Sequence, residues 1–202
     1  MATEPPKIGR KPLIRIAVVI LILLGVYSYF AGTYNEMVRL DENVQSAWGQ
    51  VENQYQRRAD LIPNLVNTVK GYAAQEKEVL LGVTEARSRV GQVQQQANPT
   101  DPGSLKQFES AQAQMSSALS RLLVVAERYP ELKSDQNFRE LQAELAGTEN
   151  RITVARKRYI DSINAYNVLV REFPVNLTAK VLGYAPKPQF SVENEAAISK
   201  PP

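Results

Sequence analysis

LIRIAVVILILLGVYSYFA, residues 13–31, is an almost unbroken apolar run of 19 residues near the start of the chain. A bilayer core about 30 Å thick requires about 20 helical residues at about 1.5 Å each, so this run can cross a membrane once. Its one ionised side chain, Arg15, lies near the amino end of the run, where a long side chain can reach the lipid headgroups. Residues 13–32 are therefore predicted to form a transmembrane helix, with the lipid bilayer as partner.

The end of the run distinguishes an anchor from a cleaved signal peptide. A signal peptide has a shorter apolar region and small residues at its cleavage site, whereas Tyr29 stands where a small residue is required. Tyr27, Tyr29 and Phe30 are typical of the aromatic belt at the edge of a membrane span. We therefore expect an uncleaved anchor from Leu13 to this belt; a cleaved signal peptide and a buried core helix are the alternatives.

Basic residues are concentrated before the apolar run. The chain has 24 Lys and Arg against 21 Asp and Glu, and four of the basic residues but one acidic residue lie within residues 1–32. The remaining 170 residues carry 20 basic and 20 acidic side chains. By the positive-inside rule, residues 1–12 are predicted to be a cytosolic basic arm and the body to lie across the membrane. A neutral body also argues against nucleic-acid binding, which requires a basic face.

The chain contains neither Cys nor His. This excludes disulfides, thiolate nucleophiles, the usual zinc sites and proton transfer by imidazole. Glu140 and Glu144 have the spacing of metal ligands in helical bundles, but the histidine partners of such sites are missing. We therefore predict no catalytic residue, no metal site and no cofactor.

Apolar residues recur with helical spacing for about 140 residues after the span. The first run, from Leu40 to Tyr55, can continue the membrane helix outward. A second helix is expected to begin at Asp60 as its N-cap, with Pro63 in the first turn, and to run to Val93.

Prolines delimit the later helices. Residues 98–103, with two prolines and a glycine, predict a loop before a third helical run that Pro130 ends. A fourth run begins after Ser134 or Asp135 as the N-cap and stops at Pro174. Residues 176–179 can form a short helix, and four prolines from residue 186 onward favour an extended or disordered tail.

Alternating spacings of three and four residues are typical of helices that pack at shallow angles. The second and fourth runs, at about 36–38 residues, would each be about 55 Å long. The predicted fold is all-α: an N-terminal transmembrane helix followed by an elongated antiparallel bundle of about four long helices. The bundle is expected over residues 33–178, with Leu145 and Ile152 in its core, and the extended or disordered tail over residues 179–202.

Two segments carry a resemblance to a known family. One is AWGQVENQYQRRADLIPNLV, residues 47–66, continuing to residue 73; the other is TENRI, residues 148–152, followed by FPVNL, residues 173–177. Together they resemble the LemA family of bacterial membrane-anchored envelope proteins, over roughly residues 34–190. The resemblance implies an anchored, elongated helical bundle in the bacterial plasma (inner) membrane. It also implies no established enzymatic activity, and other envelope or membrane proteins, such as a membrane protease, as partners.

Charged and amide side chains gather in the same two segments. They are Arg57, Arg58, Asp60, Asn64, Glu149, Asn150, Arg151 and Arg156. They can cap helices and form interhelical ion pairs that align the first, second and fourth helices, or they can form a surface for a ligand or partner. A second set, of aromatic residues on apolar stripes, is expected to fill the core rather than bind a small molecule: Trp48, Tyr55, Tyr72, Tyr159 and Tyr166.

The function expected from these features is that of a membrane-anchored envelope scaffold or adaptor that acts through protein–protein interactions of its bundle. The alternative is a ligand-sensing or substrate-presenting subunit of a membrane protease complex, with a groove near Arg57, Asp60 and Glu149. An enzyme with paired carboxylates is disfavoured, because no acid is matched with a base or nucleophile in one site. The sequence leaves open whether the protein forms a homo-oligomer.

Overall fold

The computed structural model describes residues 10–190, with side chains from Leu13 onward. Most of the predicted basic arm and residues 191–202 of the predicted tail therefore lie outside the described residues.

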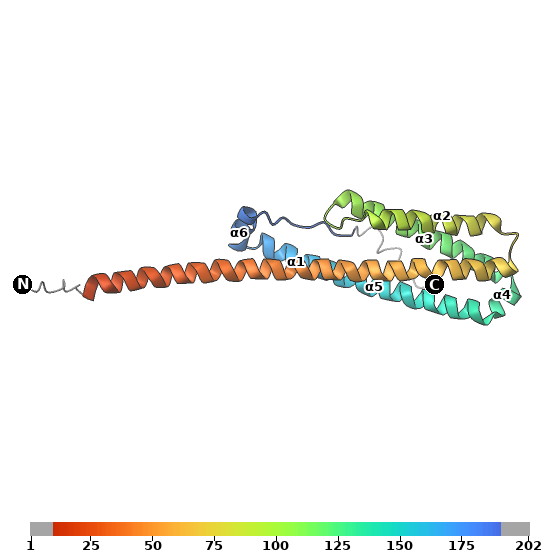
Figure 1. Cartoon of the computed structure of the whole chain (residues 1–202), viewed down its shortest axis with the longest axis horizontal. Helices are drawn as coiled ribbons and strands as arrows, with labels where there is room; N and C mark the ends of the chain where they lie inside the picture. Colours follow the sequence, from red (N-terminus) through yellow and green to blue (C-terminus); the bar gives the residue numbers. More distant parts are fainter. Residues whose placement is uncertain (1–9, 191–202) are drawn as a thin grey trace, which may run out of the picture.

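The longest element is α1, Arg10–Tyr72, which begins the chain's helical part and forms one side of the body. Its first half stands clear of the rest, as Figure 1 shows, and every side chain over residues 13–30 is exposed. This part of α1 is long and apolar enough to cross a membrane. The alternative of a buried core helix is wrong, because no part of the described chain covers these side chains.

The body is a bundle of antiparallel helices. α2, Lys77–Gln95, α3, Pro102–Glu127, and α5, Gln136–Arg171, lie beside the second half of α1 and alternate in direction (Figure 1). α1 packs mainly along α5, and α2 along α3. Two short helices complete the body: α4, Pro130–Ser134, which the sequence did not predict, and α6, Val175–Leu182. The all-α fold with helices packed in a bundle is confirmed.

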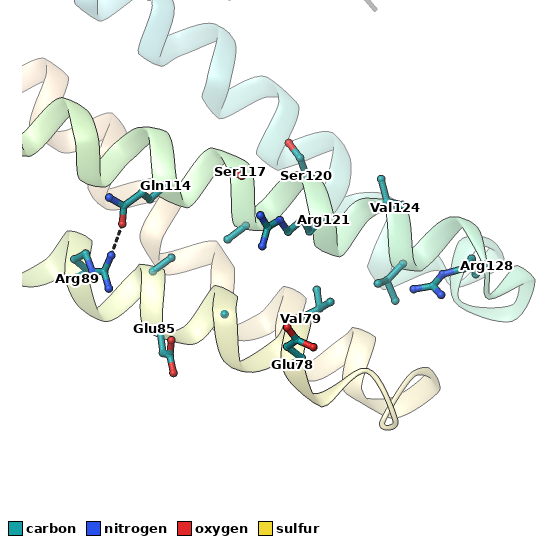
Figure 2. Close-up of a pocket in the computed structure, with 14 residues that line it drawn as sticks. Glu78, Val79, Glu85, Arg89, Gln114, Ser117, Ser120, Arg121, Val124 and Arg128 are labelled. Atoms are coloured by element: carbon teal, nitrogen blue, oxygen red, sulfur yellow. Dashed lines mark hydrogen bonds between the residues drawn. The ribbon is translucent and has the colours of Figure 1, made fainter.

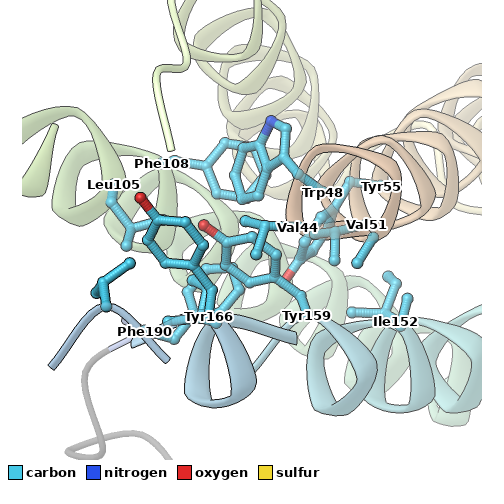
Figure 3. Close-up of a cluster of buried hydrophobic side chains, with 14 of the residues drawn as sticks. Val44, Trp48, Val51, Tyr55, Leu105, Phe108, Ile152, Tyr159, Tyr166 and Phe190 are labelled. Carbon is cyan, nitrogen blue, oxygen red and sulfur yellow. The ribbon is translucent and has the colours of Figure 1, made fainter. Parts of the chain in front are cut away.

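Buried apolar side chains form two clusters along the bundle. The cluster nearer α6 is aromatic (Figure 3): the Trp48 ring lies 5.2 Å from both Phe108 and Tyr159, centroid to centroid. The cluster nearer α4 is mainly aliphatic and includes Leu145. The aromatic residues expected in the core are buried, apart from Tyr72, whose hydroxyl donates to Asp135 at the surface. Burial of Leu145 and Ile152 is confirmed.

The expected helix start at Asp60 is wrong, because α1 continues through Pro63. Proline has no N–H, so a helix that contains it loses the bond to the carbonyl four residues earlier, that of Ala59. Here Nε of Arg87, from α2, donates to the Ala59 oxygen at 3.0 Å. Arg87 therefore supplies the donor that the Ala59 carbonyl lacks. Asp60 does not cap a helix; its side chain accepts a hydrogen bond from Gln56 on the surface of α1.

The expected second helix is also wrong in its length, because the chain reverses direction over residues 73–76. Side chains from the turn between α3 and α4 hold this corner: the Tyr129 hydroxyl accepts from Gln75 at 2.8 Å and donates to Glu76 at 3.2 Å. Arg128 forms an ion pair with the same Glu76 at 3.2 Å. Burial of Ala73 at the corner then places α2 against α3. These contacts explain why the chain turns here, although the apolar periodicity of the sequence continues through the corner.

Side-chain caps mark the starts of α3 and α5; α5 begins as expected, whereas α3 begins at Pro102, inside residues 98–103 that were expected to form a loop. The Asp135 side chain accepts from the Phe138 N–H at 2.8 Å at the start of α5, and Asp101 accepts from Ser104 N–H at 2.7 Å at the start of α3. The fourth expected helix corresponds closely to α5.

The expected tail begins inside a helix, because α6 extends to Leu182. Gly183 then adopts a left-handed conformation with φ of 79°, which allows the chain to turn back along the bundle. Residues 184–190 have no regular structure, yet they lie against α1 and α5 and we call them the strap. Asn167 binds both backbone groups of Lys187, at 2.8 and 2.9 Å, and Lys187 forms an ion pair with Asp41 at 2.7 Å.

Candidate functional site

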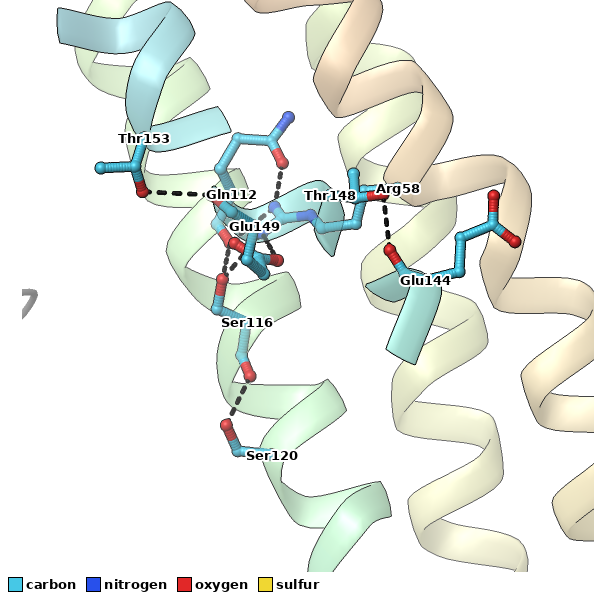
Figure 4. A network of polar contacts seen from close by, with 8 residues as sticks. All are labelled: Arg58, Gln112, Ser116, Ser120, Glu144, Thr148, Glu149 and Thr153. Carbon is cyan, nitrogen blue, oxygen red and sulfur yellow. Dashed lines mark hydrogen bonds and ion pairs between the residues drawn. The ribbon is translucent and has the colours of Figure 1, made fainter. Parts of the chain in front are cut away.

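Arg58 is the centre of the predicted polar set. Arg58 is 2% exposed and lies on the face of α1 that meets α3 and α5. Nη1 donates to Glu149 at 2.7 Å and to Ser116 Oγ at 3.0 Å, and Nη2 donates to the side chain and, at 3.3 Å, to the backbone oxygen of Gln112. Figure 4 shows these contacts converging on the guanidinium from two neighbouring helices. A buried cation with this set of acceptors aligns three helices.

Arg156 belongs to a neighbouring contact at the end of the strap. Its guanidinium lies 4.4 Å from the centroid of the Phe190 ring, and Nη2 lies 3.6 Å from Glu109 Oε1. Phe190 in turn lies 5.3 Å from Tyr159, centroid to centroid. Burial raises the pKa of the nearby Tyr55 hydroxyl. The positive charges of Arg156 and Arg58 lower this pKa, but by less than burial raises it.

The other members of the polar set lie on the surface and do not converge. Arg57 pairs with Glu144 at 2.8 Å, with both side chains about half exposed. Asn64 is exposed, and its backbone oxygen accepts from Thr68. Asn150 and Arg151 line a shallow groove between α1 and α5. The groove expected near Arg57, Asp60 and Glu149 is therefore not formed by these side chains together, because each binds a different neighbour: Glu144, Gln56 and Arg58, respectively.

A larger groove lies elsewhere, between α2 and α3, and has a volume of about 750 Å³. Small residues line it, namely Gly82, Ala86, Ser117 and Ala118. In Figure 2, Glu78 and Glu85 lie on the α2 side, whereas Arg121 and Arg128 lie on the α3 side. Arg89 donates to Gln114 across one end of the groove.

The sequence did not single out this groove. Gly82 and Ala86 are four residues apart and share one helix face, and Arg121 and Arg128 are seven apart on another. These spacings can be read from the sequence, but they predict a groove only if α2 is known to lie beside α3, and that depends on the corner at residues 73–76. The groove is open, with small residues between a mainly acidic α2 rim and a basic α3 rim.

Carboxylates do not gather in the described part of the chain. Within residues 10–190, no group of three or more Asp or Glu side chains is placed to hold a metal ion. Glu144 pairs with Arg57, and Glu140 accepts a hydrogen bond from Gln136 at 2.9 Å.

Comparison with protein families decides the classification. The model of the LemA family matches residues 47–202, which is most of the chain and includes the Arg58 network, the groove and the strap. The chain belongs to the LemA family. Known relatives of this LemA family member include the magnetosome protein MamQ of Magnetospirillum gryphiswaldense, which is 26% identical over 90% of this chain and 73% of its own length.

Two further relatives show the same range of similarity. The magnetosome protein MamQ 2 of Paramagnetospirillum magneticum is 26% identical over 89% of this chain and 73% of its own length. The protein LemA of Metamycoplasma hominis is 24% identical over 80% of this chain and 71% of its own length.

Proposed function

We propose that this LemA family member is a membrane-anchored envelope scaffold or adaptor, which binds other membrane or envelope proteins through its helical bundle and carries out no catalysis. The proposed location is the bacterial inner membrane, with a single span, a cytosolic amino terminus and an extracytoplasmic bundle. Family membership, the exposed apolar part of α1 and the neutral charge of the body support this proposal.

The observation that carries the proposal is the groove between α2 and α3. Small residues on both helices allow the backbone of an incoming helix to come close. The α2 rim carries Glu78 and Glu85 as well as Arg89, which donates to Gln114, and the α3 rim carries Arg121 and Arg128. The excess of acidic groups on one rim and of basic groups on the other favours a partner helix whose two flanks carry opposite charges. Such a helix from another envelope protein would bind by the helix-in-groove mode.

Gly82 offers a precise test of this groove. A Cβ atom built at Gly82 meets no atom within 4 Å, and the same holds for Gly91, which is on α2 but outside the groove. Gly82→Leu and Gly91→Leu both replace glycine with a good helix former, so neither is expected to destabilise α2. They differ in whether the added side chain fills the groove.

The measurement is photo-crosslinking of the full-length protein in native membranes, with a photoreactive phenylalanine analogue in place of Ser117. We expect a discrete adduct, identified by mass spectrometry, that Gly82→Leu abolishes and Gly91→Leu retains. No adduct from the groove, or an adduct indifferent to Gly82→Leu, would contradict the proposal.

Orientation has its own test. Protease added to intact spheroplasts should digest the bundle, because the positive-inside rule places it outside. A bundle protected until the membrane is lysed would show the reverse orientation.

A further inference from the structure

The short helix α6 presents an apolar face to its surroundings. Thr178 and Ala179 are buried against the bundle, whereas Leu177 and Val181, four residues apart, point away, with Val181 85% exposed. Phe173, just before α6, is 76% exposed, and Leu182 at its end is also exposed. The part of α6 turned away from the bundle is therefore a compact apolar surface.

This surface continues onto α1. Between the two helices lies an apolar hollow of about 530 Å³, lined by Tyr29, Phe30 and Tyr34 of α1 and by Leu177, Val181 and Leu182 of α6. Figure 1 shows α6 at the end of the bundle where the first half of α1 emerges. The exposed apolar side chains of α6 thus extend the exposed apolar band of residues 13–30 sideways.

The position of α6 along α1 corresponds to the end of the apolar run. Thr33 and Met37 are buried, so α1 enters the body within a few residues of Phe30. If residues 13–31 span the bilayer, residues 29–34 lie at the boundary between acyl chains and headgroups, and α6 lies beside them. Interfacial helices bury their apolar face about 5–10 Å into this boundary.

We propose that α6 is a membrane-docking helix, which inserts Phe173, Leu177, Val181 and Leu182 into the outer leaflet of the membrane that α1 crosses. Lipid acyl chains fill the hollow between α6 and Tyr29, Phe30 and Tyr34. This inference rests on the proposed anchoring by α1.

Charges at the edge of α6 fit this placement. Arg171, at the end of α5, and Lys180, in α6, are exposed and can reach lipid phosphates, and Glu172 is exposed between them in the sequence. Docking by α6 adds a second attachment point to the single span and so holds the bundle at one angle to the membrane.

The chain has no cysteine, so single cysteines can carry a fluorescent label at chosen depths. The variants are Val181→Cys on α6, Leu21→Cys in the middle of the apolar run and Val154→Cys on the exposed surface of α5. The full-length protein is labelled with an environment-sensitive dye and reconstituted into phosphatidylcholine–phosphatidylglycerol vesicles. Nitroxide lipids quench from a shallow or a deep position, and iodide quenches from the water.

We expect the label at residue 181 to lose roughly half of its emission to the shallow nitroxide and to resist iodide, as at an interfacial helix. The label at residue 21 should respond to the deep nitroxide, and the label at residue 154 to iodide alone.

Each other outcome has a distinct meaning. Quenching at residue 21 without quenching at residue 181 overturns docking by α6 and leaves the anchor intact. A label at residue 181 shielded from both iodide and nitroxides shows that a second copy covers α6, which also overturns the inference. No lipid quenching at residue 21 contradicts the anchor itself, and docking with it.

Discussion

The carbonyl oxygen of Ala59 accepts a hydrogen bond from Nε of Arg87, 28 residues further along the chain, at 3.0 Å. Pro63 deprives this carbonyl of its helical donor, and Arg87 replaces the donor from α2. The contact joins the proline-containing turn of α1 to its neighbour.

Arg87→Ala should therefore destabilise the fold by about 1–2 kcal/mol, because it leaves the Ala59 carbonyl without a donor. In a Pro63→Ala background the N–H of residue 63 restores the helical bond, so the same change should cost much less. Urea unfolding of the full-length protein in detergent, followed by the emission of the single tryptophan, Trp48, measures both effects. Equal losses in the two backgrounds would show that Arg87 acts independently of Pro63.

Arg57 and Arg58 provide a matched pair of neighbouring arginines. Arg58→Ala should lower the free energy of unfolding by about 3 kcal/mol, because Gln112 and Ser116 lose a buried donor and Glu149 its cation. Arg57→Ala removes only a half-exposed ion pair with Glu144 and should cost less than about 1 kcal/mol. Comparable losses from the two substitutions would contradict this division between a buried junction and a surface pair.

Tyr159 and Tyr166 lie seven residues apart on α5 and should respond oppositely to loss of the hydroxyl. Among the described residues, the buried Tyr159 hydroxyl has no hydrogen-bond partner, so Tyr159→Phe should be neutral or stabilise by about 1 kcal/mol. The Tyr166 hydroxyl donates to the Ala185 oxygen at 3.2 Å, so Tyr166→Phe should destabilise by about 1 kcal/mol. Thermal unfolding followed by circular dichroism tests both; a loss at Tyr159 would reveal a partner for that hydroxyl.

Alkaline pH should lower the free energy of unfolding through Tyr159 and Tyr166. Burial, followed by the negative charge of Asp41, raises the pKa of Tyr166 to about 12, against about 10 in an unfolded chain. Since the folded state holds this proton more tightly, its stabilising effect is complete below about pH 10 and is lost as the pH rises towards 12. Burial raises the pKa of Tyr159 as well. In a variant with both Tyr159→Phe and Tyr166→Phe, the free energy of unfolding should fall less steeply above about pH 10 than in the unchanged protein. If the two proteins lose stability equally with pH, these two tyrosines do not cause the loss.

Phe190 should hold the strap over the aromatic cluster. Its ring lies 6.1 Å from that of Trp48, centroid to centroid, and under the Arg156 guanidinium. Phe190→Ala should shift Trp48 emission to longer wavelength and increase its quenching by acrylamide, with a loss of roughly 2–3 kcal/mol, less than for a central core residue because the strap can move away. Gln189→Ala is the control, because it removes a hydrogen bond from the strap to Asn164 but no ring contact with Trp48. Unchanged Trp48 emission would show that the strap does not protect the cluster.

Local signals in the sequence predicted the features that depend on neighbouring residues. Asp135, one of the two expected N-caps, accepts from the N–H group three residues later, and apolar spacing alone is sufficient to predict α5 and its buried Leu145 and Ile152. Where distant residues decide, prediction failed. Pro63 lies inside a helix because Arg87 supplies a donor, and the corner after Tyr72 forms around Tyr129.

The same distinction applies to the candidate sites. Residue type was enough to place Arg58 and Glu149 in one polar set, but it did not assign them to each other as partners. It could not separate buried Arg58 from exposed Arg57, since adjacent residues on a helix differ only in the direction each faces. The groove between α2 and α3, and the strap, depend on tertiary packing, so neither could be derived from spacing alone.

α1 runs without interruption from the proposed membrane span to the far end of the bundle. About 41 residues separate Ala31 from Tyr72, or about 60 Å of continuous helix at 1.5 Å per residue. Without the proposed docking of α6, a change of about 10° in the tilt of residues 13–31 would move the far end of the bundle sideways by about 10 Å. With α6 docked, the groove-bearing end of the bundle would instead stay at one height above the membrane surface when bilayer thickness, and with it the preferred tilt of a span, changes.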